Sequence, residues 1–259
     1  MAIVGKPSQV KPARSALIAA SQLAPEARRA LLQRTHALES EIFRNVERFE
    51  EYAARVLAAG ELWVWTLKDP AGRLVGYNVI TYDEYDHRGA PIGVYRANVA
   101  LLPDYRGHNR TVATGLRLAL PRLIRRPGRR LYFHSFLQHP SIYVMMDTYS
   151  ETMWPTPRCD PPSADALELI DFLERQGSAP PRWDPASPWV VRLPTSVVEG
   201  DEEIAAWLGS SRRSARYFFE KNPHYREGGA LTILVPLTLT NLLRAVGRVM
   251  TQQFRRRRS

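Results

Sequence analysis

The sequence predicts an α/β (α+β) protein in which helices flank a β-sheet, and three observations predict it. Apolar residues recur at helical spacing between Pro25 and Gly60. Three strand-like runs joined by short turns follow over residues 61–102. A helix-like run, a strand-like run and a second helix-like run then occupy residues 110–149. Such an alternation is typical of a sheet with helices packed on it.

The composition is that of a folded, basic protein. The chain has 259 residues, of which 44% are hydrophobic, enough for one large domain or one domain with a sizeable extension. Its net charge is +10, and four of the positive charges belong to the arginine run 255–258. The rest of the chain is still basic, so we expect it to attract anions. A phosphorylated cofactor, an acidic carrier protein, nucleic acid and an anionic membrane surface all remain open.

Cysteine usage and hydropathy indicate a cytoplasmic protein. Cys159 is the only cysteine, so neither an intrachain disulfide nor a cysteine-based zinc site is expected. The short apolar stretch 15–24 follows several basic residues, but serine and glutamine interrupt it, so we reject a signal peptide. The sequence has no run of about 18 to 20 apolar residues, the length that spans a bilayer.

The first elements are a lead and a helical region. Residues 1–22 carry basic side chains without a periodic apolar pattern and are interpreted as an N-terminal basic lead. Pro25 suits a first helical turn and Gly60 a helix end. The region between them is either one long helix or two short ones with a break near His36.

The next elements are three strands. Residues 61–67 and 73–85 are rich in β-branched and aromatic residues, and the turn 69–72 between them predicts a hairpin. A second turn at 87–91 leads to a third strand over 92–102. The alternation of polar and apolar residues predicts that Arg96 and Asn98 share one face of this third strand.

A helix, a strand and another helix follow. The helix is predicted over 110–124, with a kink at Pro121. The strand is predicted over 129–137, and the second helix over 139–149. The C-terminal region then alternates between proline-rich connectors and short elements: helices at 164–176 and 201–221, strands at 189–194 and 230–239, and a final amphipathic helix with the arginine tail.

The segment PDYRGHNRT, residues 103–111, lies between a predicted strand and a predicted helix. The first amides of a helix have no internal partner and carry partial positive charge, so a pyrophosphate placed there collects several hydrogen bonds. Arg106, His108 and Arg110 add charge. The alternative is an ordinary strand-to-helix turn whose arginines face solvent.

The order of elements over residues 61–150, together with the phrase VALLPDYRGHNRT, resembles the GNAT superfamily of N-acyltransferases. The loop pattern of that family is Arg/Gln-x-x-Gly-x-Gly/Ala. Arg106 matches its first position, whereas Asn109 and Thr111 replace the glycine and the small residue. The residues that match the wider family phrase are Pro103, Tyr105 and Gly107.

The resemblance implies a splayed mixed β-sheet flanked by helices, with a C-terminal extension. Residues 23–158 would form the acyltransferase core, and residues 159–259 would complete the sheet and carry the amphipathic helix and arginine tail. The implied co-substrate is acyl-CoA or another acyl-pantetheine donor, the implied acceptor is a small-molecule amine, and no metal is implied. The residues expected to bind the donor are Leu101, Leu102, Tyr105, Arg106, Gly107, His108, Asn109, Arg110 and Thr111.

The resemblance also implies catalytic roles. A backbone N–H within the strand end Val99–Leu102 would stabilise the oxyanion. His134 is the candidate base. The family tyrosine that protonates the leaving thiolate aligns with Met146, so Tyr143 and Tyr149, one turn to either side, are the candidate acids. The alternatives are a hydrogen-bonded strand histidine and two packing tyrosines.

The C-terminal region leaves further alternatives open. Its architecture resembles acyl-homoserine-lactone synthases and N-acyl amino acid synthases, which use acyl-CoA or acyl carrier protein. The apolar, then amphipathic, then polybasic end fits either an anionic membrane surface or a docked helix with a solvated tail. The basic residues lack the aromatic interleaving that is typical of single-strand binding, which argues against nucleic acid as a partner. A non-catalytic GNAT-like binding domain and a basic membrane- or nucleic-acid-associated module remain as alternatives to an enzyme.

Overall fold

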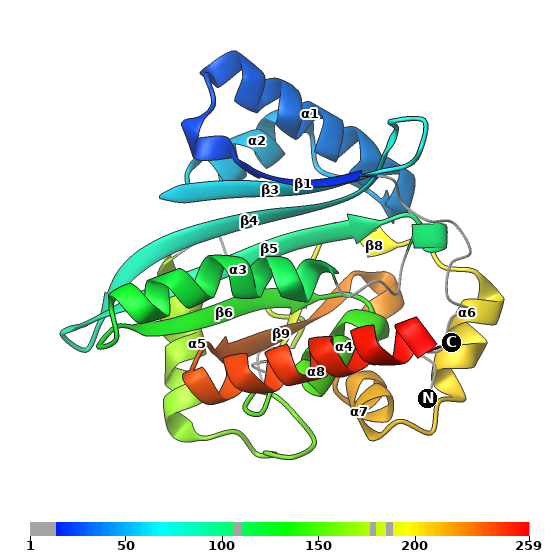
Figure 1. Ribbon diagram of the computed structural model, residues 1–259. Helices are drawn as coiled ribbons and strands as arrows, with labels where there is room; N and C mark the ends of the chain where they lie inside the picture. Colours follow the sequence, from blue (N-terminus) through cyan, green and yellow to red (C-terminus); the bar gives the residue numbers. More distant parts are fainter. Residues whose placement is uncertain (1–13, 106–109, 177–179, 185–188, 259) are drawn as a thin grey trace.

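A computed structural model describes residues 14–105, 110–176, 180–184 and 189–258. Within these residues, seven strands form one sheet in the order β1-β3-β4-β5-β6-β9-β7, and β2 and β8 form a separate ribbon. The sheet is mixed, because β5 and β6 are parallel while the other neighbours are antiparallel. Helices flank it (Figure 1). The predicted α/β class, a mixed sheet flanked by helices, is confirmed.

The first four strands in the order of the sheet pair with one another in antiparallel orientation. They are β1 Arg14–Ala19, β3 Glu61–Lys68, β4 Leu74–His87 and β5 Ala90–Leu101. The turn between β3 and β4 is closed by Asp69, whose carboxylate accepts the Arg73 N–H at 2.9 Å. Gly72 in this turn has a φ of 89°, which favours glycine. The predicted hairpin and third strand therefore form, with ends shifted by one or two residues.

Two early expectations need correction. Residues 14–19 are not part of a loose lead, because they form β1, where Leu17 pairs with Trp65 on the edge of β3. The helical region is two helices, α1 Pro25–Ile42 and α2 Phe49–Leu57, but the break does not fall near His36. His36 lies inside α1, and its Nε2 is 2.7 Å from the carbonyl oxygen of Glu47 in the connection.

The second half of the sheet combines distant parts of the chain. Strand β6, Arg130–Leu137, pairs with β9, Gly229–Pro236, and β9 pairs with β7, Val190–Arg192. The C-terminal hundred residues therefore contribute β9 as an inner strand and β7 as an edge. The two-stranded ribbon joins β2, Phe43–Arg44, to β8, Ser196–Val197.

The remaining helices surround this sheet. They are α3 Arg110–Arg125, α4 Pro140–Tyr149, α5 Ala164–Gln176, α6 Asp201–Leu208, α7 Arg213–Lys221 and α8 Leu239–Arg258. The single helix predicted over 201–221 is two helices, because α6 ends at Leu208, Gly209 caps it, and α7 begins only at Arg213. Pro121 lies inside α3. In the described residues, no helix has the length and apolar character needed to cross a membrane.

The two faces of the sheet are covered by different helices. On one face, α1 and α2 pack on Val64, Tyr77 and Val79. On the opposite face, α3 and α8 pack on Ile80 and Tyr82, which alternate with those residues along β4. A larger cluster joins β6 and β9 to α4, α5 and α7, with Tyr143, Ile170, Phe218, Leu231 and Ile233 fully buried.

Candidate functional site

The parallel strands β5 and β6 pair over only four residues each. Ile92–Tyr95 pair with Arg130–Phe133, whereas β5 continues to Leu101 and β6 to Leu137. The two strands run apart toward their carboxyl ends (Figure 1). Just beyond the paired segment, the Ser135 hydroxyl donates to the Ala97 carbonyl oxygen at 3.1 Å. We call this divergence the fork, and it is the splay that the family resemblance implies.

The edge of β5 inside the fork presents backbone groups. The Ala97 carbonyl points toward β6, because it accepts from Ser135. The backbone N–H of Leu102 points in the opposite direction, toward β4, because it donates to the Val75 carbonyl oxygen at 3.0 Å. Backbone direction alternates along a strand, so the N–H and C=O of Val99 also point into the fork. Among the described residues, neither group of Val99 has a hydrogen-bond partner.

The start of α3 lies near the fork. A short 3-10 turn, Pro103–Tyr105, follows β5, and α3 begins at Arg110. The Thr111 hydroxyl is 4.0 Å from the Met145 sulfur, so the first turn of α3 lies beside α4. The unpaired amides of that turn are the groups that bind a phosphate in other proteins.

The predicted donor-binding residues are placed only in part. Leu101 ends β5 and Leu102 follows it, and both pack with Trp65 and Val75. Tyr105 packs against the same cluster. The predictions for Arg106, Gly107, His108 and Asn109 lie outside the described residues.

One wall of the fork is built by α1 and the ribbon that follows it. The Asn98 amide of β5 donates to Glu39 Oε1 of α1 at 3.2 Å. Helix α1 runs directly into β2, which pairs with β8. The Val198 N–H then donates to the Ile42 carbonyl oxygen at 3.0 Å, which fixes the residues after β8 to the end of α1.

The opposite wall follows β6. His139 caps α4, and its Nδ1 accepts the Ser141 N–H at 3.0 Å. Its Nε2 lies 2.7 Å from the carboxylate of Glu199, which follows β8, and 3.3 Å from the carboxylate of Glu203 in α6. Contacts therefore run around the open end of the fork from β5 through α1, β2 and β8 to β6. Three carboxylates, those of Glu39, Glu199 and Glu203, lie on this path.

Glu39 is a buried carboxylate with a perturbed pKa. Burial raises its pKa above the usual range, and the hydrogen bond from Asn98 offsets part of that rise. The Tyr77 hydroxyl lies close enough to Glu39 to lower this pKa as well, although within the described part of the chain Glu39 Oε2 has no hydrogen bond of good geometry. A buried carboxylate oxygen without a hydrogen bond of good geometry is uncommon and calls for a functional explanation.

His134 lies on β6 at the fork and is 1% exposed. Burial, together with a smaller effect of the nearby Arg96, lowers its pKa to about 3. Neither ring nitrogen has a hydrogen-bond partner among the described residues. A base works best with a pKa near the operating pH, so this imidazole is better suited to hold a substrate by a hydrogen bond. Its role as a base stays a prediction.

The depressed pKa of His134 predicts a pH-dependent stability. Between its unfolded pKa of about 6.5 and its folded pKa of about 3, the unfolded chain binds a proton that the native state does not. Stability is therefore lost as the pH falls through this window, by about 1.4 kcal/mol per pH unit. We expect His134→Gln to lose less stability between pH 7 and pH 5 than the wild type does, as measured by urea unfolding. Parallel curves for the two proteins would contradict the buried, neutral state.

The two candidate tyrosines are buried in α4. The Tyr143 hydroxyl donates to the Pro155 carbonyl oxygen at 3.0 Å, and its ring stacks on Tyr217 with centroids 6.2 Å apart. Burial raises the Tyr143 pKa above its usual value. This geometry favours the packing alternative for Tyr143. Tyr149 is also buried, at the end of α4.

Arg96 and Asn98 both make polar contacts from β5, the strand on which the alternation predicts that they share a face. Arg96 donates to Asp83 at 3.2 Å and to the Tyr85 hydroxyl at 3.0 Å, while Asn98 reaches Glu39. Sequence reasoning missed Glu39 and Glu199. The one signal that pointed to Glu39 was the polar Asn98 in an otherwise apolar strand. In the described residues, no group of three or more His, Cys, Asp or Glu side chains has the arrangement of a metal site.

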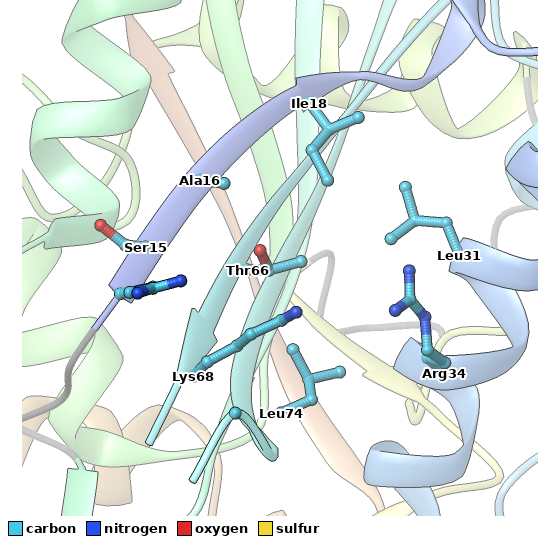
Figure 2. Close-up of a pocket in the computed structure, with 10 residues that line it drawn as sticks. Ser15, Ala16, Ile18, Leu31, Arg34, Thr66, Lys68 and Leu74 are labelled. Atoms are coloured by element: carbon cyan, nitrogen blue, oxygen red, sulfur yellow. The ribbon is translucent and has the colours of Figure 1, made fainter. Parts of the chain in front are cut away.

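A separate hollow of about 580 Å³ lies at the other edge of the sheet, between β1, β3 and α1. Figure 2 shows Lys68 from β3 and Arg34 from α1 directed toward the same space. Leu31 and Leu74 supply apolar lining. Strand β4 separates this hollow from the fork, and none of the predicted site residues lines it.

No protein-family model matches the chain, and no curated protein matches it. Among solved structures, the chain is similar to the NatC complex bound to Gag peptide and CoA, with 13% identity over 87% of this chain and 100% of that one, at a TM-score of 0.37. It is also similar to the ribosomal-protein-S18-alanine N-acetyltransferase from Escherichia coli, with 11% identity over 87% and 96%, at a TM-score of 0.36. A third is Arabidopsis thaliana NAA60 in complex with acetyl-CoA, with 15% identity over 54% and 89%, at a TM-score of 0.36. Similarities at these values carry no argument about activity.

Proposed function

We propose that this chain is a GNAT-type N-acyltransferase that moves an acyl group from acyl-CoA to a small-molecule amine. The observation that carries the proposal is the fork, where β5 leaves β6 and Val99 turns its backbone groups away from β4. The loop resemblance over residues 103–111 supports it.

The donor fits the fork by strand addition. The pantetheine arm carries two amides, which can pair with an open strand edge as an added strand does. Its pyrophosphate then falls near the first turn of α3, where Arg106, His108 and Arg110 of the predicted loop add positive charge. The thioester oxygen accepts from the Val99 N–H, and this bond strengthens as the oxyanion forms.

The acceptor enters from the acidic end of the fork. Glu39, Glu199 and Glu203 attract an ammonium group, and the ammonium must lose a proton before it attacks. Glu39 is the candidate base, because its pKa is raised and its Oε2 has no hydrogen bond of good geometry among the described residues. Glu39 takes one proton from the ammonium, the neutral amine nitrogen forms a bond to the acyl carbon, and the carbon–sulfur bond breaks. The second nitrogen proton passes to the thiolate, either directly or through Tyr149 or water, so that Tyr149 ends protonated.

CoA binding tests the donor assignment directly. We expect CoA at 100 times its Kd to stabilise the protein by about 2.7 kcal/mol, because it binds only the folded state. Thermal unfolding with CoA, acetyl-CoA and a long-chain acyl-CoA measures the effect, and ADP serves as a control for phosphate charge. A folded sample that none of the CoA species stabilises would contradict CoA as the donor, and acyl carrier protein then becomes the donor to test.

A second candidate function is non-catalytic binding of an acyl thioester. One observation favours it, since the Tyr143 hydroxyl is committed to Pro155 and the aligned family position is Met146. Mass spectrometry of free CoA and acylated amine distinguishes the two. Binding without product across a panel of amines would favour the non-catalytic function.

A further inference from the structure

Helices α3 and α8 share an exposed apolar surface. Nine large hydrophobic side chains are exposed among the described residues, and six of them lie on these two helices. On α8 they are Leu239, Leu243, Val246 and Met250, which are 38–62% exposed. On α3 they are Leu120, 39% exposed, and Ile124, 69% exposed. We call these six residues the apolar stripe.

The stripe follows the helical repeat. The four residues of α8 are spaced by four, three and four positions, so they lie on one side of that helix. A different side of α8 packs on the protein core, because Leu242 and Ala245 are buried. Helix α3 packs beside α8 on the same face of the sheet, through Ala119 and Leu242 (Figure 1). Both helices are therefore held in place by the core while their apolar side chains face outward.

The charge on the same two helices has one sign. Helix α3 contains four arginines, α8 contains six, and neither contains an acidic residue. Arg122 is paired with Glu61 and Arg244 with Glu151, but Arg117 and Arg248 have no carboxylate partner among the described residues. The parts of the chain outside the description contain no Asp or Glu side chain that could pair with them.

The apolar stripe and the positive charge together favour one class of binding partner over the others. A second copy of the chain would bring one arginine-rich face against another, which is repulsive. A nucleic acid would leave six aliphatic side chains without apolar contact. An anionic bilayer satisfies both features, because its headgroups attract the arginines and its acyl region receives the aliphatic side chains.

We propose that the α3–α8 face, through the apolar stripe and its arginines, binds the surface of membranes rich in anionic lipid. The helices lie flat on the bilayer and do not cross it. The proposal does not depend on the acyltransferase function, because none of the stripe residues lies at the fork.

Vesicle sedimentation of the full chain tests this surface. Vesicles with 30% phosphatidylserine in phosphatidylcholine are compared with pure phosphatidylcholine at about 0.15 M salt, the ionic strength at which screening is physiological. We expect at least tenfold stronger partitioning onto the anionic vesicles. Equal binding to both vesicle types, or binding to neither, would overturn the proposal.

Matched variants separate the stripe from general charge. We expect Ile124→Gln with Leu243→Gln to weaken partitioning at least tenfold, and Arg117→Gln with Arg248→Gln to weaken it and reduce its salt dependence. The controls are Leu208→Gln on α6 and Arg216→Gln on α7, which are exposed, lie away from the stripe and should change partitioning less than twofold. Because all these positions are exposed, circular dichroism should show unchanged folding.

Other partners give distinct results. If Ile124→Gln with Leu243→Gln leaves vesicle binding intact, basic side chains alone are responsible for binding and the stripe assignment is wrong. If the same variants abolish a dimer seen by sedimentation velocity without affecting vesicle binding, the stripe is a contact between copies. Binding of single-stranded RNA that competes fully with vesicles would also contradict the membrane assignment.

Discussion

Replacing Val99 with proline is expected to lower kcat about 10²- to 10³-fold, the usual effect of removing one oxyanion donor. Proline removes the Val99 N–H, which points into the fork and takes no part in the ladder with β4. Proline is tolerated on a strand edge whose N–H is unpaired, so we expect the fold to persist. Initial rates with acetyl-CoA and the best acceptor amine measure the effect.

Val99→Ala is the matched control, since it shortens the same side chain but keeps the N–H. We expect its kcat to stay within a few-fold of the wild type. The two variants are compared at equal folded fraction, measured by thermal unfolding. Equal rates for Val99→Pro and Val99→Ala would show that this amide does not stabilise the transition state, even if CoA binding is confirmed.

Replacing Glu39 with glutamine is expected to lower kcat about 10²- to 10⁴-fold, the range for a lost general base. The same change should raise stability at neutral pH or leave it unchanged. A carboxyl whose folded pKa is raised loses stability as the pH rises above its unfolded pKa, because ionisation is disfavoured in the native state. Glutamine removes that cost and still accepts a hydrogen bond from Asn98.

Glu41→Gln is the control for this experiment. Glu41 is two residues away on α1, is exposed and pairs with Arg73. It should change neither rate nor stability appreciably. The wild-type rate should also fall as the pH decreases through the raised pKa of Glu39, and this limb should vanish in Glu39→Gln. A fully active Glu39→Gln would exclude Glu39 as the base and direct attention to Glu199.

Most of the fold could be predicted from local patterns. The hairpin of β3 and β4 is defined by two apolar runs around Asp69–Gly72, and α5 begins and ends where its periodicity does. Strand β1 was missed because Arg14–Ala19 has little β-branched character of its own. It becomes a strand through pairing with β3, which is a tertiary effect. The division between α6 and α7 was missed because the polar run 209–214, which begins with Gly209, was interpreted as part of one helix.

The site was less accessible to prediction. The resemblance correctly implied that the sheet splays after the third long strand. The carboxylates at the fork could not be found locally, because Glu39 meets Asn98, and Glu199 meets His139, only after distant segments pack together. The desolvation that shifts the pKa values of Glu39 and His134 is likewise a property of the packed protein and not of the neighbouring residues.

The position of β9 has a consequence for synthesis of the chain. Strand β6 is translated well before its antiparallel partner β9. The edge of β6 is therefore unpaired until Leu231, which pairs with Leu137, has been synthesised. Pairing between such distant segments folds slowly. A nascent chain therefore exposes the β6 edge to other strands until its last part has left the ribosome. Fragments that end before Gly229 should aggregate or recruit chaperones, even though they contain the whole fork.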